Sequence, residues 1–549
     1  KGLGGFHLAC RAFASDSIER LRRRKNRRGK PRAIMVPDLA AAAELAEISD
    51  REQAWLCSWQ RPIVLVNAKN KLLPEILAPD TQRVGIMLPS TPLHHLLLQA
   101  CSRHAGTGKL SALVMTSGNR SANPLALGNR EALATLRDIA DRFLLHNRDI
   151  CIRCDDSVLG VTPTTQRTVF FRRARGFTPA PIFFKKPGPS VLGLGAETKA
   201  TVCLTRDNRA YVSQHIGDLT TVASFEYFQE TIRHLQTILK IRPRGVITDL
   251  HPDFLSSRYA EQWPDLPRLS LQHHFAHLYA VLGEHQLDEP ILGLALDGSG
   301  LGTDHSIWGG ELLLLDPRRD EQSRLGHFSP VPLPGGDAAV GEPWKTALGV
   351  LQALGHPGPV SRTWPWSRSR SGEAALLQDM LDKNINSPLT TSCGRLFDAV
   401  AALLGLSLAI DYEGQAAIRL ETIQDRSETA VYPCPLINRS PVGLLDILTL
   451  FQAVLKDWDQ GVPAARISRR FHLGLLTGLC HWAQAAARAT GLKKIGLSGG
   501  VFQNLTLADE LPGRLVGAGL EVLQHRTLPP NDGCIAFGQA VFGQYRLQE

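Results

Sequence analysis

The sequence lacks the features of a membrane or secreted protein. No apolar run approaches the roughly 18 residues that a membrane-spanning helix needs. No charged and then apolar leader with a cleavage site is present. We therefore expect a cytoplasmic protein that does not act on a membrane. With 549 residues the chain is too long for one hydrophobic core, and about 150 residues per domain predicts three or four lobes.

Paired cysteines are also scarce. Ten cysteines are scattered singly along the chain, apart from the pair Cys151 and Cys154. A Cys-x-x-Cys pair without a second pair is weak evidence for zinc, and no thioredoxin-like pattern follows it. The scatter is typical of reduced thiols in a cytosol.

Acidic residues are missing from residues 20–32, which contain nine basic ones. This segment alone equals the net charge of +9, so the rest of the chain is balanced. That localisation argues against a broad nucleic-acid-binding face, and we do not expect nucleic acid as a partner. A basic run is usually a solvated helix end, but here we favour a local anion site.

A metal-ligand pattern occupies residues 269–304. His273 and His277 are four residues apart, so a helix would place both imidazoles on one face. An apolar run at 291–296 predicts a buried strand that ends in Asp297 and a glycine-rich turn, residues 298–300. Two histidines and a carboxylate can bind a metal, and a glycine turn lets phosphate oxygens approach the main chain.

Each part of this pattern has an ordinary explanation. A His pair at this spacing is often a surface accident or a capped polar group in the core, and a Gly-rich turn is often only a hairpin. A second Asp-Gly loop at residues 529–533, which carries Asp532, favours a metal and phosphate site over these alternatives.

Other parts of the sequence predict strands that end in polar or glycine-rich turns. A strand at 111–115 runs into residues 116–124, which could bind phosphate or Mg²⁺ or form a simple polar turn. Two strand–glycine turn–strand units, at 191–204 and 294–304, form a faint repeat of the kind found in the duplicated actin, sugar-kinase and Hsp70 fold. The prolines within residues 177–190 predict a linker. The composition of residues 356–372 predicts a surface insertion.

Lys25-x-Arg27-x-x-x-Pro31, together with Thr116-Ser117-Gly118-Asn119-x-Ser121, resembles the YrdC-type nucleotide-binding domain. In that family the Lys, Arg, Ser and Asn contact ATP and an acyl-adenylate. The chemistry agrees, because an oxyanion that attacks the α-phosphate of ATP needs dense positive charge to offset repulsion between anions.

Residues 191–549 resemble a metal-dependent carbamoyltransferase lobe related to the tRNA threonylcarbamoyl transferases. With a YrdC-like lobe first, and LPGGD, SCGRLFDAV, YEGQAA, SGGVFQN and PPNDG in order, the whole chain resembles the hydrogenase maturation carbamoyltransferases of the HypF family. Full-length members carry an acylphosphatase-like domain and zinc fingers upstream, so we expect this chain to be a fragment.

The resemblance implies an α/β protein in three segments. Residues 1–183 would be a YrdC-like domain that binds ATP and forms carbamoyl-adenylate, and 184–190 a Pro-rich linker. Residues 191–549 would be a two-lobed carbamoyltransferase domain of the duplicated actin and Hsp70 type, ATPase-like in fold.

The implied reaction uses ATP, Mg²⁺ and carbamate derived from carbamoyl phosphate, and releases AMP and pyrophosphate. The carbamoyl group would pass through an internal cavity to the C-terminal cysteine of HypE, for the cyanide ligands of NiFe hydrogenase. One divalent metal, Fe or Zn, would polarise the carbamoyl oxygen or grip the adenylate phosphate.

The site residues follow from the same resemblance. The metal ligands would be His273, His277, Asp297 and Asp532, and the catalytic residues Lys25, Arg27 and His274, the last facing away from the metal or contacting substrate. The nucleotide or adenylate contacts would be Lys1, Lys25, Arg27, Ser117, Asn119, Arg148, Arg175, Gly298, Gly300, Gly394, Asp398, Glu413, Gly499, Gly500 and Asn504.

Four positions depart from the pattern that we expect of this family. They are Asp304-His305 in place of Asp-Gly, Gly341 in place of a basic residue, Ala200 in place of Asn and Cys534 in place of Gly. A Cβ at Cys534 could crowd the metal loop, and we hypothesise that the fold tolerates it.

Three other functions remain open. Synthesis of threonylcarbamoyladenosine in tRNA would suit a pI near 9, although the charge is confined to one segment. O-carbamoylation of a small molecule is a second alternative, but enzymes of that kind have the two lobes in the opposite order. A non-enzymatic scaffold is the third, and it predicts that His273 and Asp532 are dispensable.

Overall fold

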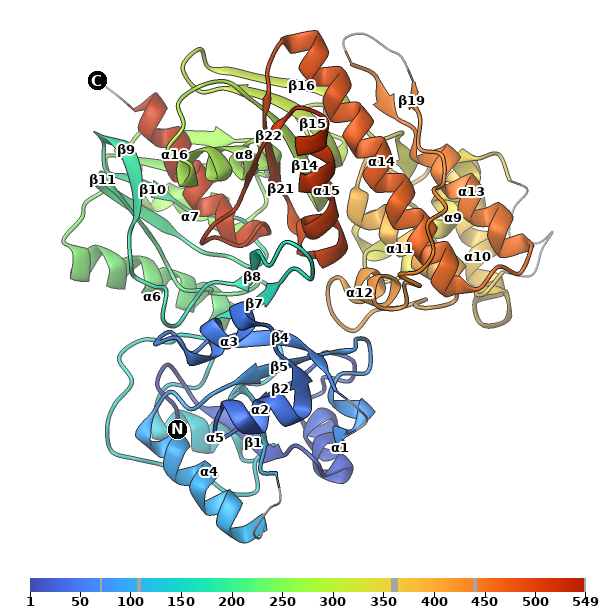
Figure 1. Ribbon diagram of the computed structural model, residues 1–549. Helices are drawn as coiled ribbons and strands as arrows, with labels where there is room; N and C mark the ends of the chain where they lie inside the picture. Colours follow the sequence, from blue (N-terminus) through green and yellow to red (C-terminus); the bar gives the residue numbers. More distant parts are fainter. Residues whose placement is uncertain (70–71, 106–109, 357–363, 438–441, 548–549) are drawn as a thin grey trace. The chain divides into compact units, whose positions relative to one another are not determined.

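The computed structural model describes residues 1–69, 72–105, 110–356, 364–437 and 442–547 (Figure 1). The chain forms two compact units. Unit 1 comprises residues 1–248, 253–269 and 526–549, and unit 2 comprises residues 249–252 and 270–525. Among the described residues, no helix is both long enough and apolar enough to cross a membrane.

The first sheet of unit 1 is mixed, with strand order β1-β6-β2-β5-β4-β7-β8 and β3 paired to β4. Its strands are β1 (His7–Arg11), β2 (Ala33–Met35), β3 (Ala46–Glu47), β4 (Ile63–Ala68), β5 (Arg83–Met87), β6 (Leu113–Ser117), β7 (Val158–Val161) and β8 (Thr168–Arg172). The accompanying helices are α1 (Ser15–Arg24), α2 (Leu39–Leu45), α3 (Asp50–Cys57), α4 (Pro92–Ala105) and α5 (Asn129–Leu136). Ser117 therefore ends a strand, rather than lying in the turn after one.

The second sheet of unit 1 has the order β13-β12-β10-β11-β9. Its strands are β9 (Ile182–Gly188), β10 (Val191–Gly193), β11 (Cys203–Val212), β12 (Gly245–Asp249) and β13 (Arg268–Leu271). The helices α6 (Val222–Leu239), α7 (Leu255–Tyr259) and α16 (Ile535–Arg546) belong with it. The prediction of a linker at 184–190 is wrong, because most of that segment is β9, which pairs with β11. Its Pro187 is tolerated because β9 is an edge strand.

The main sheet of unit 2 has the order β17-β18-β15-β14-β21-β22, with β16 paired to β15. Its strands are β14 (Ile291–Leu301), β15 (Ile307–Asp316), β16 (Glu321–His327), β17 (Val331–Pro332), β18 (Leu389–Thr390), β21 (Lys494–Ser498) and β22 (Glu521–Gln524). A two-stranded sheet pairs β19 (Leu436–Ile437) with β20 (Leu444–Leu445). The strand that precedes Asp297 does not end there: β14 continues to Leu301 after its register with β15 shifts between Leu296 and Gly300.

The two larger sheets that follow β8 share one topology, which confirms the expected duplicated α/β fold. In each, the first strand of a hairpin pairs antiparallel with the second, β10 with β11 and β14 with β15. On its other side the same strand pairs parallel with a later strand, β10 with β12 and β14 with β21. A parallel partner requires a long crossover, which α6 supplies for β10, while a much longer segment intervenes before β21.

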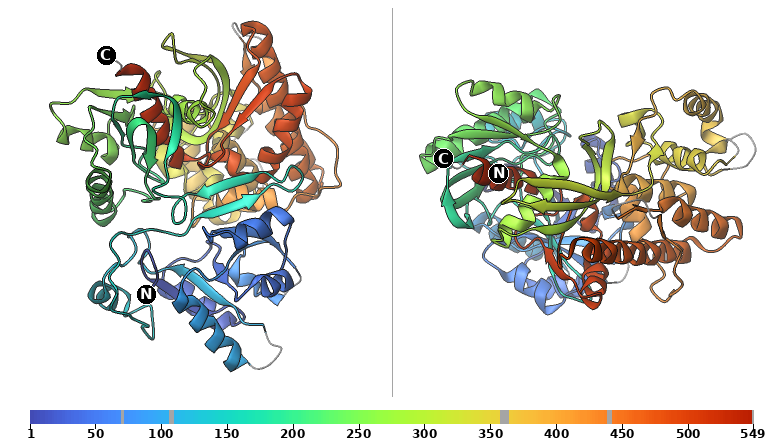
Figure 2. Two further views of the ribbon diagram at one scale, coloured as in Figure 1. Left: turned by 60° about the vertical axis from the view of Figure 1, so that its left-hand side comes forward. Right: turned by 90° about the horizontal axis from the view of Figure 1, so that it is seen from above.

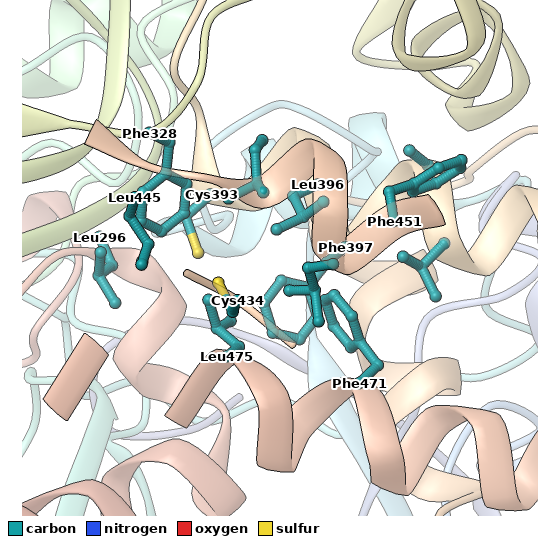
Figure 3. Packing of buried hydrophobic residues seen from close by; sticks show 14 of the residues in the cluster. Leu296, Phe328, Cys393, Leu396, Phe397, Cys434, Leu445, Phe451, Phe471 and Leu475 are labelled. Carbon is teal, nitrogen blue, oxygen red and sulfur yellow. The ribbon is translucent and has the colours of Figure 1, made fainter. Parts of the chain in front are cut away.

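Helices accompany the sheet of unit 2, and all of them except α8 contribute residues to its largest core. They are α8 (His273–Glu284), α9 (Pro343–Ala353), α10 (Ser367–Asp382), α11 (Cys393–Leu403), α12 (Gln415–Thr422), α13 (Ile447–Asp459), α14 (Ala464–Thr490) and α15 (Leu505–Gly517). The longest, α14, is the orange-red helix in Figures 1 and 2. In Figure 3, Leu296 of β14, Cys393 of α11 and Phe471 of α14 contribute to one apolar cluster. This core anchors Leu296, the residue before Asp297, and Cys393, the residue after Ser392.

The predicted surface insertion at 356–372 is not supported in its described part. Residues 357–363 lie outside the described residues. Trp364 and Trp366 are buried, with stacked rings 5.6 Å apart. Trp364 and Trp366 therefore belong to the core, whereas Ser369, Ser371 and Gly372 are exposed.

Candidate metal and nucleotide site

Helix α8 carries the predicted histidines and is buried along its whole length. It begins after Gln272, whose side-chain oxygen accepts hydrogen bonds from the backbone N–H groups of His274 and Phe275. This cap satisfies two of the donors that a helix start leaves open. His273 and His277 then lie one turn apart with their rings 5.1 Å from each other, which confirms that the two histidines share a helix face.

Asp297 of β14 completes a cluster with these two histidines. Its Oδ2 atom lies 2.9 Å from Nε2 of His277 and 3.6 Å from Nε2 of His273. One candidate ligand atom from each of the three residues lies within 4.8 Å of the others. All three side chains are nearly inaccessible to solvent.

The carboxylate of Asp297 is held by main-chain donors as well as by the imidazoles. Its Oδ1 accepts hydrogen bonds from the N–H groups of Gly298 and Gly500, at 2.7 and 3.2 Å. Burial raises the pKa of Asp297, but the hydrogen bonds and charges of the two histidines outweigh burial and hold that pKa well below its usual range. The carboxylate is therefore ionised, and its Oδ2 faces the histidines.

Both histidines are anchored through their Nδ1 atoms. Nδ1 of His273 lies 2.8 Å from a carboxylate oxygen of Asp249, and Nδ1 of His277 lies 2.9 Å from the hydroxyl of Ser498. This leaves Nε2 of each ring directed at Asp297, an arrangement common to metal-ligating histidines.

The three residues fit a divalent metal. Ligand atoms bound about 2.0–2.2 Å from one tetrahedral or octahedral ion lie about 3 Å apart, close to the two distances measured here. Two imidazole nitrogens and a carboxylate oxygen suit zinc or iron and leave coordination positions for substrate or water.

His274 faces a different environment from its two neighbours. Because the oxygen of Gln272 is used in the helix cap, its amide nitrogen is the donor to Nδ1 of His274, at 3.0 Å. The proton of His274 therefore resides on Nε2, which is buried without a hydrogen-bond partner among the described residues. Burial, followed by the charge of His273, lowers the pKa of His274 well below its usual range, so the ring is a neutral donor.

The predicted glycines lie where the backbone segments approach most closely. A Cβ on Gly300 would come within 2.7 Å of the His274 ring, and one on Gly394 within 3.0 Å of the Cα of Gly298. Gly499 has φ +106°, and a Cβ there would lie 2.1 Å from the carbonyl oxygen of Leu296. The SGG and DGSG motifs are thus packed together around Asp297.

Two residues predicted to contact nucleotide, Asp398 and Asn504, have other contacts in unit 2. Asp398 is buried in an ion pair with Arg395, 2.7 Å away. Asn504 caps α15 through its oxygen, and its amide nitrogen lies 3.1 Å from Nε2 of His472. Glu413 is exposed just before α12. Asp398 of the SCGRLFDAV motif and Asn504 of the SGGVFQN motif therefore have structural contacts, whether or not they also contact a nucleotide.

Lys25 organises the basic segment of unit 1. Its side chain is buried, and its amino group donates to the hydroxyl of Ser117 at 3.1 Å, to Oδ1 of Asn119 at 3.0 Å and to the carbonyl of Ser117. Burial, followed by the charges of Arg27 and Arg32, lowers the pKa of Lys25 well below its usual range. Residues from both predicted motifs therefore meet, as the YrdC resemblance implies.

The neighbouring guanidinium groups add to this positive cluster. Arg27 is itself shifted to a lower pKa by burial and then by Arg172. Burial and then Arg27 lower the pKa of Arg32 to about 9. Like charges gathered in a poorly solvated place favour an anionic ligand.

The other predicted nucleotide contacts of unit 1 lie outside this network. Arg175 is held by Asp156 at 2.8 Å and by two backbone carbonyls, those of Gln60 and Arg61. Lys1 donates to the carbonyl of His146, and Arg148 is exposed. Arg175, which we predicted to contact nucleotide, therefore forms an ion pair with Asp156 within the fold.

Asp532, the fourth predicted metal ligand, lies in unit 1. It begins the short 3-10 helix η6 (Asp532–Cys534) and accepts a hydrogen bond from the hydroxyl of Thr198. Cys534 is buried at the start of α16, so the fold accommodates its side chain.

The other family departures also have local accounts. His305 has φ +62°, the left-handed region in which Gly is normally preferred. Asp304 accepts a hydrogen bond from the indole of Trp308 at 2.8 Å and forms an ion pair with Arg324 at 3.0 Å. These contacts hold the turn in which His305 adopts its strained backbone conformation. Ala200 is buried in a backbone bridge to Gly217, and Gly341 has open space around its Cα.

Sequence reasoning assigned no role to Asp249, Ser498 or Gln272, although all three orient a histidine. Ser498 lies in the SGG motif and Asp249 ends a buried strand, so the sequence draws attention to both positions. The sequence does not reveal which residues they contact, because Ser498 contacts a histidine 221 residues earlier in the chain.

Comparison with known proteins accounts for nearly the whole chain. Residues 1–174 match the family of Sua5, YciO and YrdC, described as "Telomere recombination". Residues 186–284 match "HypF Kae1-like domain", and residues 293–539 match "Carbamoyltransferase, Kae1-like Domain, second subdomain".

Individual relatives agree with these families. Carbamoyltransferase HypF2 of Cupriavidus necator is 44% identical, over 98% of this chain and 70% of its own length. Carbamoyltransferase HypF of Rhizobium leguminosarum bv. viciae is 42% identical, over 99% of this chain and 70% of its own length. A tRNA N6-adenosine threonylcarbamoyltransferase of Syntrophotalea carbinolica is 27% identical, over only 29% of this chain and 45% of its own length.

Solved structures extend the agreement to three dimensions. Full-length HypF in its phosphate- and nucleotide-bound form superposes with a TM-score of 0.94 at 37% identity, covering all of this chain and 84% of that one. HypF of T. kodakarensis gives a TM-score of 0.92 at 34% identity, covering all of this chain and 72% of that one. The chain therefore belongs to the HypF carbamoyltransferase family and is an ATP-dependent carbamoyltransferase.

Proposed function

We propose that the chain forms carbamoyl-adenylate and transfers its carbamoyl group to the C-terminal cysteine of HypE, for the cyanide ligands of NiFe hydrogenase. In the first step a carbamate oxygen attacks the α-phosphate of ATP, Mg²⁺ accompanies the nucleotide, and pyrophosphate leaves. In the second step the cysteine sulfur attacks the carbamoyl carbon, AMP leaves and the thiol proton is lost. Carbamoyl phosphate is the ultimate source of the carbamate, and the reaction takes place in the cytoplasm.

The buried amino group of Lys25 carries this proposal. It lies among Ser117, Asn119 and the guanidinium groups of Arg27 and Arg32, in surroundings that lower its pKa. A triphosphate would reverse that shift, because each phosphate oxygen placed near Lys25 favours its charged form. We assign to residues 1–183 the role of holding the nucleotide, with Lys25 and Arg27 offsetting the repulsion between carbamate and phosphate.

The second step is assigned to residues 191–549. His273, His277 and Asp297 would hold a divalent metal, with Asp532 as a fourth ligand. Such a metal supplies Lewis acidity toward the carbamoyl oxygen or the adenylate phosphate. The buried Nε2–H of His274 is a neutral hydrogen-bond donor that can orient an anionic or carbonyl oxygen without a proton transfer.

The glycine-rich segments around Asp297 would give the substrate access to the main chain. Gly298 has open space where a side chain would stand, and its motif packs against Gly394 and Gly499. We propose that Gly298, Gly300, Gly394, Gly499 and Gly500 let the adenylate approach the backbone. Arg148, Lys1, Glu413, Asp398, Asn504 and Arg175 are further proposed contacts, and the last three would have to act alongside the bonds that they already make.

The decisive experiment measures nucleotide turnover by the purified chain. ATP and Mg²⁺ are supplied with either carbamoyl phosphate or bicarbonate and ammonia, and AMP and pyrophosphate are quantified. We expect AMP formation that depends on the carbamoyl source. Lys25→Ala should lower it by at least about 100-fold, because a charged group that stabilises the transition state is lost.

Arg23→Ala is the matched control, since Arg23 is an exposed basic residue two positions before Lys25 and lies outside the buried cluster. AMP that appeared only when threonine was added would contradict the proposal and support tRNA modification. Carbamoyl transfer is then followed by the mass of a peptide that ends in cysteine, with a serine-ended peptide as its control.

A further inference from the structure

The histidine ligand His277 begins a chain of buried hydrogen bonds that leads away from Asp297. Nδ1 of His277 lies 2.9 Å from the hydroxyl of Ser498, which lies 2.8 Å from Nε2 of His525. Nδ1 of His525 in turn lies 2.7 Å from a carboxylate oxygen of Glu284. The chain joins α8, β21 and the segment after β22, all within unit 2.

One direction of these hydrogen bonds leaves His277 able to bind a metal. In that direction a carboxylate oxygen of Glu284 accepts from Nδ1 of His525, and Nε2 of the same ring carries a lone pair. That lone pair accepts the hydroxyl proton of Ser498. The oxygen of Ser498 is then an acceptor, and Nδ1 of His277 donates to it.

This direction leaves the lone pair of His277 on Nε2, the atom that faces Asp297. The opposite direction would place a proton on Nε2 and remove the lone pair that a metal needs. The side chains of His525 and Glu284 are only 5% and 1% exposed. Water therefore cannot readily take the place of either hydrogen-bond partner if it is removed.

We propose that Glu284 and His525 are positioning residues that act through Ser498 to hold His277 in its metal-binding tautomer and orientation. The proposal rests on the metal site of the proposed function and deepens it, since it concerns groups that touch neither the metal nor the substrate. Outer partners of ligating histidines typically change metal affinity by about 10–100-fold when they are removed.

The experiment measures zinc affinity of the full chain by competition with a chromophoric chelator, without any substrate. His525→Phe, Glu284→Met and Ser498→Ala each interrupt the chain, and we expect each to weaken zinc binding by about 10–100-fold. Because the groups act in series, the double variant His525→Phe with Glu284→Met should bind zinc no more weakly than His525→Phe alone.

A matched control connects the same two segments without joining the chain. Nε2 of His285, next to Glu284, lies 2.8 Å from the carbonyl oxygen of Gln524, next to His525. His285→Asn should therefore leave zinc affinity within about twofold of wild type, even if it lowers the melting temperature of the metal-free protein. A purely structural role for His525 would instead lower that temperature and leave zinc affinity unchanged.

If His525→Phe does not fold, Ser498→Ala, which removes only one hydroxyl, still tests whether the hydrogen-bond chain affects zinc affinity. Zinc affinity unchanged in Ser498→Ala, or additive losses in the double variant, would overturn the inference while leaving the metal site intact. A wild-type chain that bound no zinc would overturn the metal site itself, and the role of the hydrogen-bond chain with it.

Discussion

Nε2 of His277 and Oδ2 of Asp297 lie 2.9 Å apart in a buried place, with the carboxylate ionised. Two lone pairs at that separation repel each other unless a proton or a metal ion lies between them. His273 approaches the same oxygen from one helical turn away. The geometry is therefore compatible with a metal ion bound by these three side chains.

Zinc should stabilise the wild-type chain, and Asp297→Asn should abolish that stabilisation. Zinc at about 100-fold above its Kd adds about 2.7 kcal/mol to the free energy of unfolding, because the metal binds only the folded site. Differential scanning calorimetry with and without zinc measures the effect. Asp304→Asn is the control, since Asp304 lies in the same hairpin but bonds to Ser306, Trp308 and Arg324. Equal zinc shifts in the two variants would contradict the prediction.

Pyrophosphate should raise the melting temperature through the cluster around Lys25. An anion relieves the repulsion among Lys25, Arg27 and Arg32, and added salt should weaken the effect by screening. We expect the shift to disappear in Lys25→Ala and to persist in Arg23→Ala, in thermal melts at two salt concentrations. A shift retained in Lys25→Ala would place the anion elsewhere.

Gly499→Ala and Gly513→Ala should have opposite effects on stability. Gly499 has φ +106° and ψ +152°, a region open essentially only to glycine, and a Cβ would meet the backbone of Leu296. We expect Gly499→Ala to lower the free energy of unfolding by at least about 3 kcal/mol. Gly513 lies in α15 with open space around it, so Gly513→Ala should raise stability by up to about 1 kcal/mol. Chemical denaturation separates the two, and equal effects would refute the geometric argument.

Acid should destabilise unit 2 through His472. Burial lowers the pKa of His472 from 6.5 to about 4, although the carbonyl of Ser468 raises it. The unfolded chain therefore binds a proton first as pH falls, so stability is intact above pH 6.5 and is lost progressively toward pH 4. At about 1.4 kcal/mol per pKa unit, the loss from this group is at most about 3.5 kcal/mol.

His472→Gln isolates that contribution. Glutamine cannot be protonated but can still accept from Nδ2 of Asn504, as His472 does through Nε2. The stability of wild type relative to His472→Gln should therefore fall between pH 6.5 and pH 4, measured by denaturant unfolding at each pH. A difference that stayed constant with pH would show that His472 does not titrate in this range.

The sequence was sufficient for the features that depend on local spacing. The i, i+4 placement of His273 and His277 follows from the helical repeat, and the apolar run before Asp297 places that carboxylate beside a glycine-rich segment. The two strand–turn–strand units indicate the duplicated fold only faintly, and the prediction of that fold rested on the family resemblance. In these cases the atoms that meet are separated by short or regular stretches of chain.

Proline composition misled where tertiary pairing outweighed it. Residues 184–188 form an edge strand because β11 offers hydrogen-bonding partners, which composition does not reveal. Asn504 and Arg175 show the same limit, since their polar groups are used by a helix cap and by Asp156. Residue type indicates which bonds a side chain can make, but not which partner reaches it first.

Only the tertiary structure decided how the histidines are oriented. His277 meets Ser498 across 221 residues, and His525 meets Glu284 across 241. No periodicity connects such positions, because the packing of α8 against β21 and β22 brings them together. The sequence by itself therefore determined which atoms could bind a metal, whereas the fold determined which nitrogen of each ring keeps its lone pair.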